Sequence, residues 1–238
     1  MKKSFKYIIG ILALTLMPAC EDWLDTKPLD KMVFEDYWKT KNDVESVVLA
    51  SYRAMLSDEF MERILISGEF RSDNIRIEQN MDTHAGIKDI FNLTIQVTND
   101  FAKWEIFYKI INYCNAVLTY APGIREIDPN YTEGWLQVHF AEAYTIRALT
   151  YFYLVRIYGD VPFVVRPYAD DTENFNIGFS SEEEILNTLI ADLKIAEQYA
   201  VISRGNATPS DKILTKGRVT KNAVRALMAD IYLWLASG

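Results

Sequence analysis

The feature that most constrains the fold of this chain is a series of segments in which apolar residues recur every three or four positions. Apolar residues at that period line one face of an amphipathic helix. Five segments carry the pattern: one beginning near Thr40, one beginning at Asn99 or Asp100 and ending at Pro122-Gly123, one over about 132–158, one beginning after Ser181 and one beginning after Thr220. The sequence therefore predicts an all-α fold, built mostly from antiparallel helix pairs.

Two of the expected helices begin at residues that suit a helix N-terminus. Thr40 is followed three positions later by Asp43, and Ser181 is followed at the same spacing by Glu184. In such a capping box the hydroxyl and the carboxylate satisfy backbone N–H groups that the first helical turn leaves unpaired. The segment 159–162, Gly-Asp-Val-Pro, is expected to end the third helix, because glycine and proline follow helix ends.

The third helix is apolar nearly all round from Tyr144 onward, which predicts a central, buried position. Ala148 precedes Phe152 by four residues, and Ala229 precedes Leu233 at the same spacing. This spacing resembles the packing positions of tetratricopeptide helices, where a small residue lets the next helix approach. We therefore expect tetratricopeptide-like helix pairs with irregular loop insertions.

The first twenty residues resemble a lipoprotein signal. Lysines at the start precede an apolar run over 7–17, which is shorter than the roughly 20 residues that a membrane-spanning helix needs. Ala19-Cys20 resembles the end of a lipobox, so residues 1–19 are expected to be removed and Cys20 to become the lipidated first residue of a mature chain over 20–238. The alternative is an ordinary cysteine beside an ordinary cleavage site.

Glu21-Asp22 look like a signal that sends some Bacteroidetes lipoproteins to the outer surface, or else form a solvated linker.

Composition and motifs argue against several function classes. The formal net charge is −8 and no basic patch is present, so nucleic acid is not an expected partner. The two cysteines and two histidines lack the spacing of zinc ligands, and no phosphate-binding glycine loop, nucleophile elbow or His-Glu-x-x-His motif occurs. The acidic pairs and runs are expected to be solvated or to lie at a helix N-terminus. We therefore expect no catalytic residues, no metal site and no cofactor, and a protein that is not an enzyme.

Several residues that could look functional are expected to serve packing. The aromatic group Trp104, Phe107 and Tyr108 lies on the apolar stripe of the second helix and is predicted to be core. Asn112 and Asn115 are predicted to satisfy neighbouring backbone groups. We also expect Glu142 and Arg147 to bond to neighbouring helices, His139 to be a packing residue, and Cys114 to behave as a small buried apolar residue.

Four blocks of sequence, in order along the chain, resemble the SusD/RagB family of outer-membrane nutrient-binding lipoproteins. They lie at 20–40, 104–115, 141–162 and 218–229, and the third, which begins Ala-Glu-Ala-Tyr-Thr-Ile-Arg-Ala, is the most specific. The resemblance implies capture of oligosaccharides or other nutrients at the cell surface and delivery to a SusC-type TonB-dependent transporter. It also implies a location at the outer membrane, held by the lipid anchor and facing outside. Family members are longer, so this chain is expected to be an incomplete, N-terminal helical domain. The alternative is a helical-repeat protein that assembles envelope proteins without binding sugar.

The irregular stretch between the first two helices is the best local candidate for ligand binding. Helical periodicity is lost from about 63 to 99, residues 68–74 read as a turn or loop, and the alternation over 92–98 predicts a short strand. Long irregular segments are often functional, and planar polar side chains with an aromatic face suit sugars. For any single residue, a loop that only covers a helix pair remains the alternative. The candidate ligand-binding residues are Arg71, Asp73, Asn74, Arg76, Asn80, His84, Phe91 and Asn92.

Overall fold

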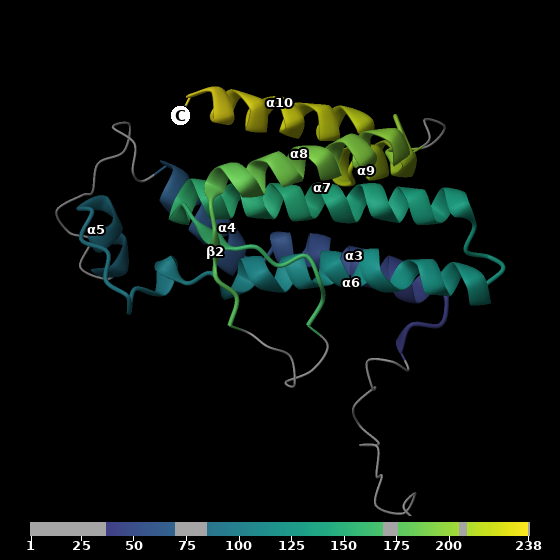
Figure 1. Cartoon of the computed structure of the whole chain (residues 1–238), viewed down its shortest axis with the longest axis horizontal. Coiled ribbons are helices and arrows are strands. Elements are labelled where there is room, and N and C mark those ends of the chain that lie inside the picture. Colours follow the sequence, from purple (N-terminus) through teal and green to yellow (C-terminus); the bar gives the residue numbers. More distant parts are fainter. Residues whose placement is uncertain (1–36, 70–84, 169–175, 205–208, 238) are drawn as a thin grey trace, which may run out of the picture. The chain divides into compact units, whose positions relative to one another are not determined.

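The computed structural model describes residues 37–69, 85–168, 176–204 and 209–237, and helices dominate these ranges (Figure 1). The described helices are α3 (Lys41–Met55), α4 (Asp58–Glu69), α5 (Ala85–Phe91), the 3₁₀ turn η2 (Asp100–Ala102), α6 (Glu105–Ile127), α7 (Glu133–Tyr158), α8 (Glu182–Tyr199), α9 (Pro209–Gly217) and α10 (Lys221–Ser237). One antiparallel pair of two-residue strands, β1 (Val161–Pro162) and β2 (Phe179–Ser180), accompanies them. The predicted all-α class is confirmed. None of the helices in the described ranges combines the length and hydropathy that a membrane span requires.

The helix ends follow the local signals in the sequence. At the start of α3 the backbone N–H of Thr40 donates to Asp43 Oδ2 at 2.7 Å, and at the start of α8 the hydroxyl of Ser181 accepts from the Glu184 N–H at 3.3 Å. Helix α7 ends at Gly159, which has a φ of +75°. The capping box at Thr40 and the predicted end of α7 are therefore confirmed, and at Ser181 the hydroxyl contact of the predicted box is present.

Helix α7 occupies the centre of the helical part, as predicted. It packs against α6 on one side and α8 on the other, while α3 packs on α6 and α10 on α8 (Figure 1). Because every side of α7 meets another helix, even its polar residues are buried, among them Glu142 and Arg147. Large apolar side chains fill the core between these layers, and each contributes roughly 1.5–3 kcal/mol by leaving water.

Helical periodicity was predicted to be lost from about Arg63, but α4 continues to Glu69. The pattern is interrupted because a cation, Arg63, occupies a core position of the apolar stripe. Phe60, Arg63 and Ile66 are all buried on the same face. The Arg63 guanidinium donates to three backbone carbonyl oxygens, of Lys103 at 2.6 Å, Glu59 at 2.6 Å and Asp100 at 3.2 Å. Hydrogen bonds of this kind offset the cost of burying a charge, so the helix tolerates a residue that interrupts the pattern. Helix α5 lies within the stretch predicted to be irregular, so that part of the prediction is wrong, and helix α9 was not predicted either.

The second predicted helix differs from α6 at both ends. Asn99 does cap a helical turn, since its side chain accepts from the Phe101 N–H at 2.9 Å, but that turn is η2 and α6 begins only at Glu105. Pro122 lies inside α6, which continues to Ile127, so the predicted end at Pro122-Gly123 is wrong. The interior proline costs about 3 kcal/mol. Burial of Ala121 and Ile124 against neighbouring helices offsets that cost.

The strand predicted over 92–98 is also wrong. Leu93 adopts a positive φ of 58°, and the Thr94 N–H donates back to the Asp89 carbonyl oxygen at 2.8 Å. Val97 is fully exposed, so the alternating side chains have no buried face. A strand needs both a partner and a face to bury, and this stretch pairs with no strand in the described part of the chain.

Candidate ligand-binding site

Most of the candidate residues from the sequence lie outside the described ranges. This holds for Arg71, Asp73, Asn74, Arg76, Asn80 and His84, and also for Cys20. The two candidates that are described lie at the end of α5, where Phe91 is half-buried and Asn92 is exposed.

A cavity with an aromatic wall lies close to those two residues. Its volume is about 340 Å³, within the range of about 300–1,000 Å³ that is common for small-molecule sites. We call it the aromatic cavity. It is lined by Ser67, Ile90, Ile95, Gln96, Val97, Phe101, Ala102, Trp104, Ile157 and Tyr158.

A small satellite core holds the wall of the aromatic cavity in place. Ile66, Ile87 and Ile90 pack together and Phe101 packs against them. Asn99 links the two sides of this core, because its side-chain amide donates to the Gly86 carbonyl oxygen at 2.8 Å and its oxygen accepts from Phe101. A side chain on Gly86 would meet Asn99 at 3.1 Å and Phe101 at 3.2 Å, so this close approach needs a glycine.

Trp104 is the aromatic residue that the sequence analysis placed wrongly. Phe107 is fully buried as predicted, but Trp104 is only partly buried and lines the aromatic cavity. Its ring meets Tyr158 at 5.6 Å and Tyr108 at 5.9 Å between centroids, both in edge-to-face geometry. Burial raises the pKa of Tyr158 to about 12, so its hydroxyl keeps its proton at neutral pH. The predicted helix started at Asn99 or Asp100 and placed Trp104 within it, whereas α6 begins only at Glu105 and leaves Trp104 at the helix end, where a residue has fewer neighbours.

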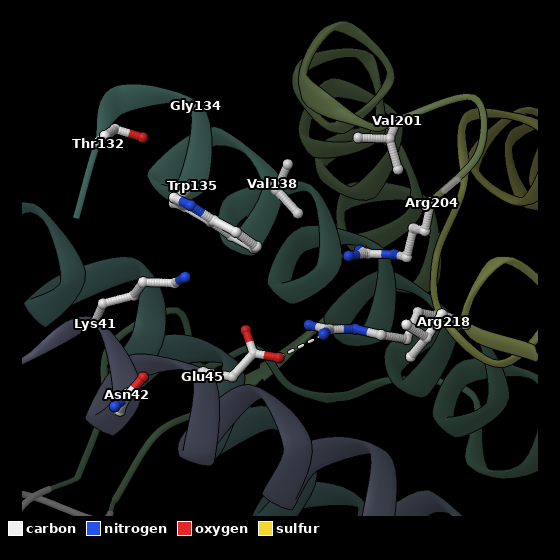
Figure 2. A pocket seen from close by; sticks show the side chains of 11 residues that line it. Lys41, Asn42, Glu45, Thr132, Gly134, Trp135, Val138, Val201, Arg204 and Arg218 are labelled. Carbon is white, nitrogen blue, oxygen red and sulfur yellow. Dashed lines mark hydrogen bonds and ion pairs between the residues drawn. The ribbon is translucent and has the colours of Figure 1, made fainter. Parts of the chain in front are cut away.

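A second, larger cavity carries charged groups on its walls. Its volume is about 630 Å³, and Figure 2 shows side chains from α3, from α7 and from the segment around α9 converging on it. We call it the charged cavity. It is lined by Lys41, Asn42, Glu45, Thr132, Gly134, Trp135, Val138, Val201, Arg204, Leu214 and Arg218. None of these residues was predicted from the sequence to bind a ligand, because they lie in segments far apart in the chain.

Behind the charged cavity, two carboxylates and two guanidinium groups form a compact ion cluster. Glu142, which is fully buried, pairs with Arg204 at 2.5 Å and with Arg218 at 2.6 Å. It also accepts from the Tyr52 hydroxyl at 2.9 Å. Glu45 pairs with Arg218 as well and receives a hydrogen bond from His139 at 2.6 Å. Glu142 thus binds neighbouring segments, as predicted, and His139 is a buried packing residue.

The remaining polar residues of the core also serve the scaffold. Arg147 bonds to Asn115 on α6 at 2.8 Å and to Asp192 on α8 at 2.5 Å. The Asn115 amide donates to the carbonyl oxygens of Val164 and Arg166, at 3.0 Å and 3.1 Å. Asn112 exchanges two hydrogen bonds with the backbone of Tyr168. The predictions for these residues are confirmed.

Cys114 is buried, and burial raises the pKa of its thiol to about 12, so the reactive thiolate is absent at neutral pH. Within the described ranges, no three His, Cys, Asp or Glu side chains gather in a way that could hold a metal ion. The aromatic cavity instead offers ring faces and amide groups, and the charged cavity offers cations beside a tryptophan.

Known proteins with similar sequences are described as SusD-like. SusD-like protein P38 of Formosa agariphila is 27% identical over 239 residues, an alignment that covers 98% of this chain and 43% of that protein. A SusD-like protein of Bacteroides ovatus is 25% identical, covering 97% of this chain and 39% of its own length. The chain therefore spans less than half the length of these relatives.

Solved structures show the same fold. A SusD superfamily protein from Bacteroides thetaiotaomicron has a TM-score of 0.71 and 25% identity, over 84% of this chain and 45% of that one. A structure described as a laminarin binding SusD-like protein has a TM-score of 0.68 and 23% identity, over 84% of this chain and 41% of that one. At this identity the second likeness concerns the fold alone. A family model described as SusD-like, starch-binding and associating with the outer membrane matches residues 22–233. With nearly the whole chain covered by that model, this protein belongs to the SusD-like family.

Proposed function

We propose that this chain binds an oligosaccharide without transforming it, at the outer membrane, and passes it to a SusC-type transporter. The observation that carries the proposal is the aromatic cavity, which is lined by Ile90, next to the candidate residue Phe91. The description of the family as starch-binding supports an oligosaccharide as the class of ligand.

The lining of the aromatic cavity suits a sugar physically. Sugar rings present apolar C–H faces, which pack on aromatic rings such as Trp104 and Tyr158. Their hydroxyls need hydrogen-bond partners, and Gln96 and Ser67 carry such groups at the wall. Binding of this kind requires neither proton transfer nor a cofactor.

The proposal includes an anchor at Cys20 and an outward orientation. Several acyl chains hold a protein firmly, because each buried methylene adds about 0.8 kcal/mol of membrane affinity. Mass spectrometry of the mature chain tests this part, and an unmodified Cys20 would contradict it. Co-purification with a transporter of the SusC type tests the delivery step.

The binding step is tested by titrating the full chain with a panel of neutral glycans that includes starch and laminarin oligosaccharides. For a glycan that binds, Trp104→Ala is expected to weaken affinity about tenfold or more. Loss of stacking on one aromatic side chain costs about 1–3 kcal/mol of binding free energy. Trp104→Phe should retain most of the affinity, since it keeps a ring face.

Tyr232→Ala is the matched control, because Tyr232 is a half-exposed aromatic residue on α10 that lines neither cavity. Thermal unfolding of each variant checks that the fold is intact. Absence of binding to every glycan, or equal affinity of the wild type and Trp104→Ala, would reject the proposal. The first result would favour a helical-repeat interaction protein of the envelope.

A further inference from the structure

The charged cavity has two cationic walls that face each other across an open space. Lys41, at the first turn of α3, and Arg204, which follows α8, both reach toward this space (Figure 2). Trp135 in the first turn of α7 forms a third wall and is 40% exposed. The cavity, about 630 Å³ in volume, is large enough for a ligand of several sugar units.

The charges of the cavity do not cancel. In the ion cluster the two carboxylates of Glu45 and Glu142 balance the two guanidinium groups of Arg204 and Arg218. Both oxygens of Glu45 are already engaged, one by Arg218 and one by His139. The ammonium of Lys41 pairs with no carboxylate in the described part of the chain, so one positive charge remains at the mouth.

The carboxylate of Asp128 attracts Lys41 but forms no ion pair with its ammonium group. Asp128 lies nearby, but its carboxylate accepts the backbone N–H groups of Lys41 at 2.7 Å and of Asn130 at 2.9 Å. The Lys41 ammonium instead lies 3.5 Å from the centre of the Trp135 ring. A cation–π contact of this kind holds the amine in place at the cavity while leaving its charge available to an anion.

Arg204 has spare donor capacity as well. Its side chain makes one ion pair, to Glu142, and its Nε has no hydrogen-bond partner among the described residues. A buried donor without a partner is costly, and an acceptor placed beside Arg204 relieves that cost while its ion pair with Glu142 is kept. Asn42 adds an amide to the same lining.

From this combination we infer that the charged cavity is a second binding site, specific for a saccharide that carries a carboxylate, such as a uronic acid unit. The carboxylate accepts from Lys41 and approaches Arg204, in charge-assisted hydrogen bonds that are about twice as strong as neutral ones. The sugar ring contacts the exposed part of the Trp135 indole, beside the Lys41 ammonium that covers its centre. The site is separate from the aromatic cavity and shares none of its lining residues.

The test is calorimetric titration of the full chain with tri-galacturonate and, as a neutral trisaccharide, maltotriose. The wild type is expected to bind tri-galacturonate more tightly than maltotriose. Lys41→Gln should weaken tri-galacturonate binding about tenfold or more, the loss expected when one hydrogen bond to a charged group is removed. Lys41→Arg should retain most of the affinity, because it keeps the charge.

Lys39→Gln provides the matched control, since Lys39 is exposed, lies two residues away and does not line the cavity. Trp135→Ala supplies a second variant, expected to weaken tri-galacturonate binding through lost ring contact. The inference is overturned if the wild type does not bind tri-galacturonate, if maltotriose binds equally well, or if Lys41→Gln and Lys39→Gln behave alike.

Failure of this inference and failure of the proposed function give different results. A chain that binds tri-galacturonate through Lys41 but binds no neutral glycan would support the charged cavity and reject glycan capture at the aromatic cavity. A chain that binds a neutral glycan through Trp104 but not tri-galacturonate would do the reverse.

Discussion

Glu45 is a carboxylate whose ionisation is set by its neighbours. Burial raises its pKa, but hydrogen bonds from His139 and Arg218 outweigh burial and lower the pKa to about 2. The ionised carboxylate only accepts hydrogen bonds, so His139 Nε2 donates to it. Burial keeps the pKa of Tyr131 well above its usual range, and its hydroxyl donates to His139 Nδ1 at 2.9 Å when the imidazole is neutral. A chain of hydrogen bonds thus runs from Tyr131 to the ion cluster.

The low pKa of Glu45 predicts acid sensitivity. Its pKa is 4.5 when unperturbed and about 2 in the fold, so its contribution to stability is full above pH 4.5 and is lost as the pH falls toward 2. The slope from this one group is at most about 1.4 kcal/mol per pH unit. Glu45→Gln is therefore expected to be less stable than the wild type at neutral pH but to lose stability less steeply between pH 4.5 and 2.

Urea unfolding followed by circular dichroism at a series of pH values measures this difference. Glu126→Gln is the control, because Glu126 is exposed and surface substitutions of this kind change stability little. Parallel stability curves for the wild type and Glu45→Gln over this pH window would contradict the assignment.

Among the single elements, α7 shows two influences on a helix: a local signal in the sequence ends it, and packing against neighbouring helices buries it. Much of the helix is buried between α6 and α8, and it ends where Gly159 turns the chain. Gly159 has φ +75° and ψ −128°, a region that residues with a side chain rarely adopt. Helix α6 is the counter-example, since it passes through Pro122 and Gly123 without ending.

Alanine substitutions at these two glycines are expected to have opposite effects. Gly159→Ala should destabilise the fold by about 1–3 kcal/mol, the cost of one strained backbone conformation. Gly123→Ala should stabilise it by about 0.5–1 kcal/mol, because glycine in a helix costs conformational entropy. An added Cβ meets nothing within 4 Å at either position, so the backbone alone decides the sign. Equal changes in the free energy of unfolding in urea for the two variants would contradict this prediction.

At the scale of the whole helical part, buried ion pairs join segments that are distant in sequence. Glu142 on α7 meets Tyr52 on α3 and the arginines at 204 and 218, which lie on either side of α9. Arg147 joins α6 to α8 through Asn115 and Asp192. Buried pairs of this kind specify which segments come together more than they add net stability.

Removal of Glu142 is therefore expected to be severe. Glu142→Ala leaves two largely buried guanidinium groups with one carboxylate between them, and loss of one partner of a buried pair costs about 3–5 kcal/mol. That is a large part of the total stability of an ordinary domain, about 5–15 kcal/mol. The free energy of unfolding in urea measures the effect. Glu126→Ala, an exposed glutamate, should stay within about 0.5 kcal/mol of the wild type, and a cost below that for Glu142→Ala would refute the role of the cluster.

Elements whose signals are local could be predicted from the amino-acid sequence alone. The caps at Thr40 and Ser181, the stop at Gly159 and the apolar periodicity of α7 and α10 each involve residues within a few positions, so their physics can be read along the chain. The roles of Asn112, Asn115 and Glu142 could be anticipated for a related reason. A polar residue on a stripe that must be buried needs a partner.

Features that depend on distant neighbours could be recognised only in the folded chain. Arg63 within α4 is stabilised in part by the carbonyl oxygen of Lys103, which lies 40 residues further along the chain. Pro122 stays helical because other helices bury Ala121 and Ile124. The exposed face of Trp104 and both cavities depend equally on how the elements meet. The charged cavity joins Lys41, Trp135 and Arg204, which no local pattern connects, because long-range packing and charge pairing bring them together only when the chain folds.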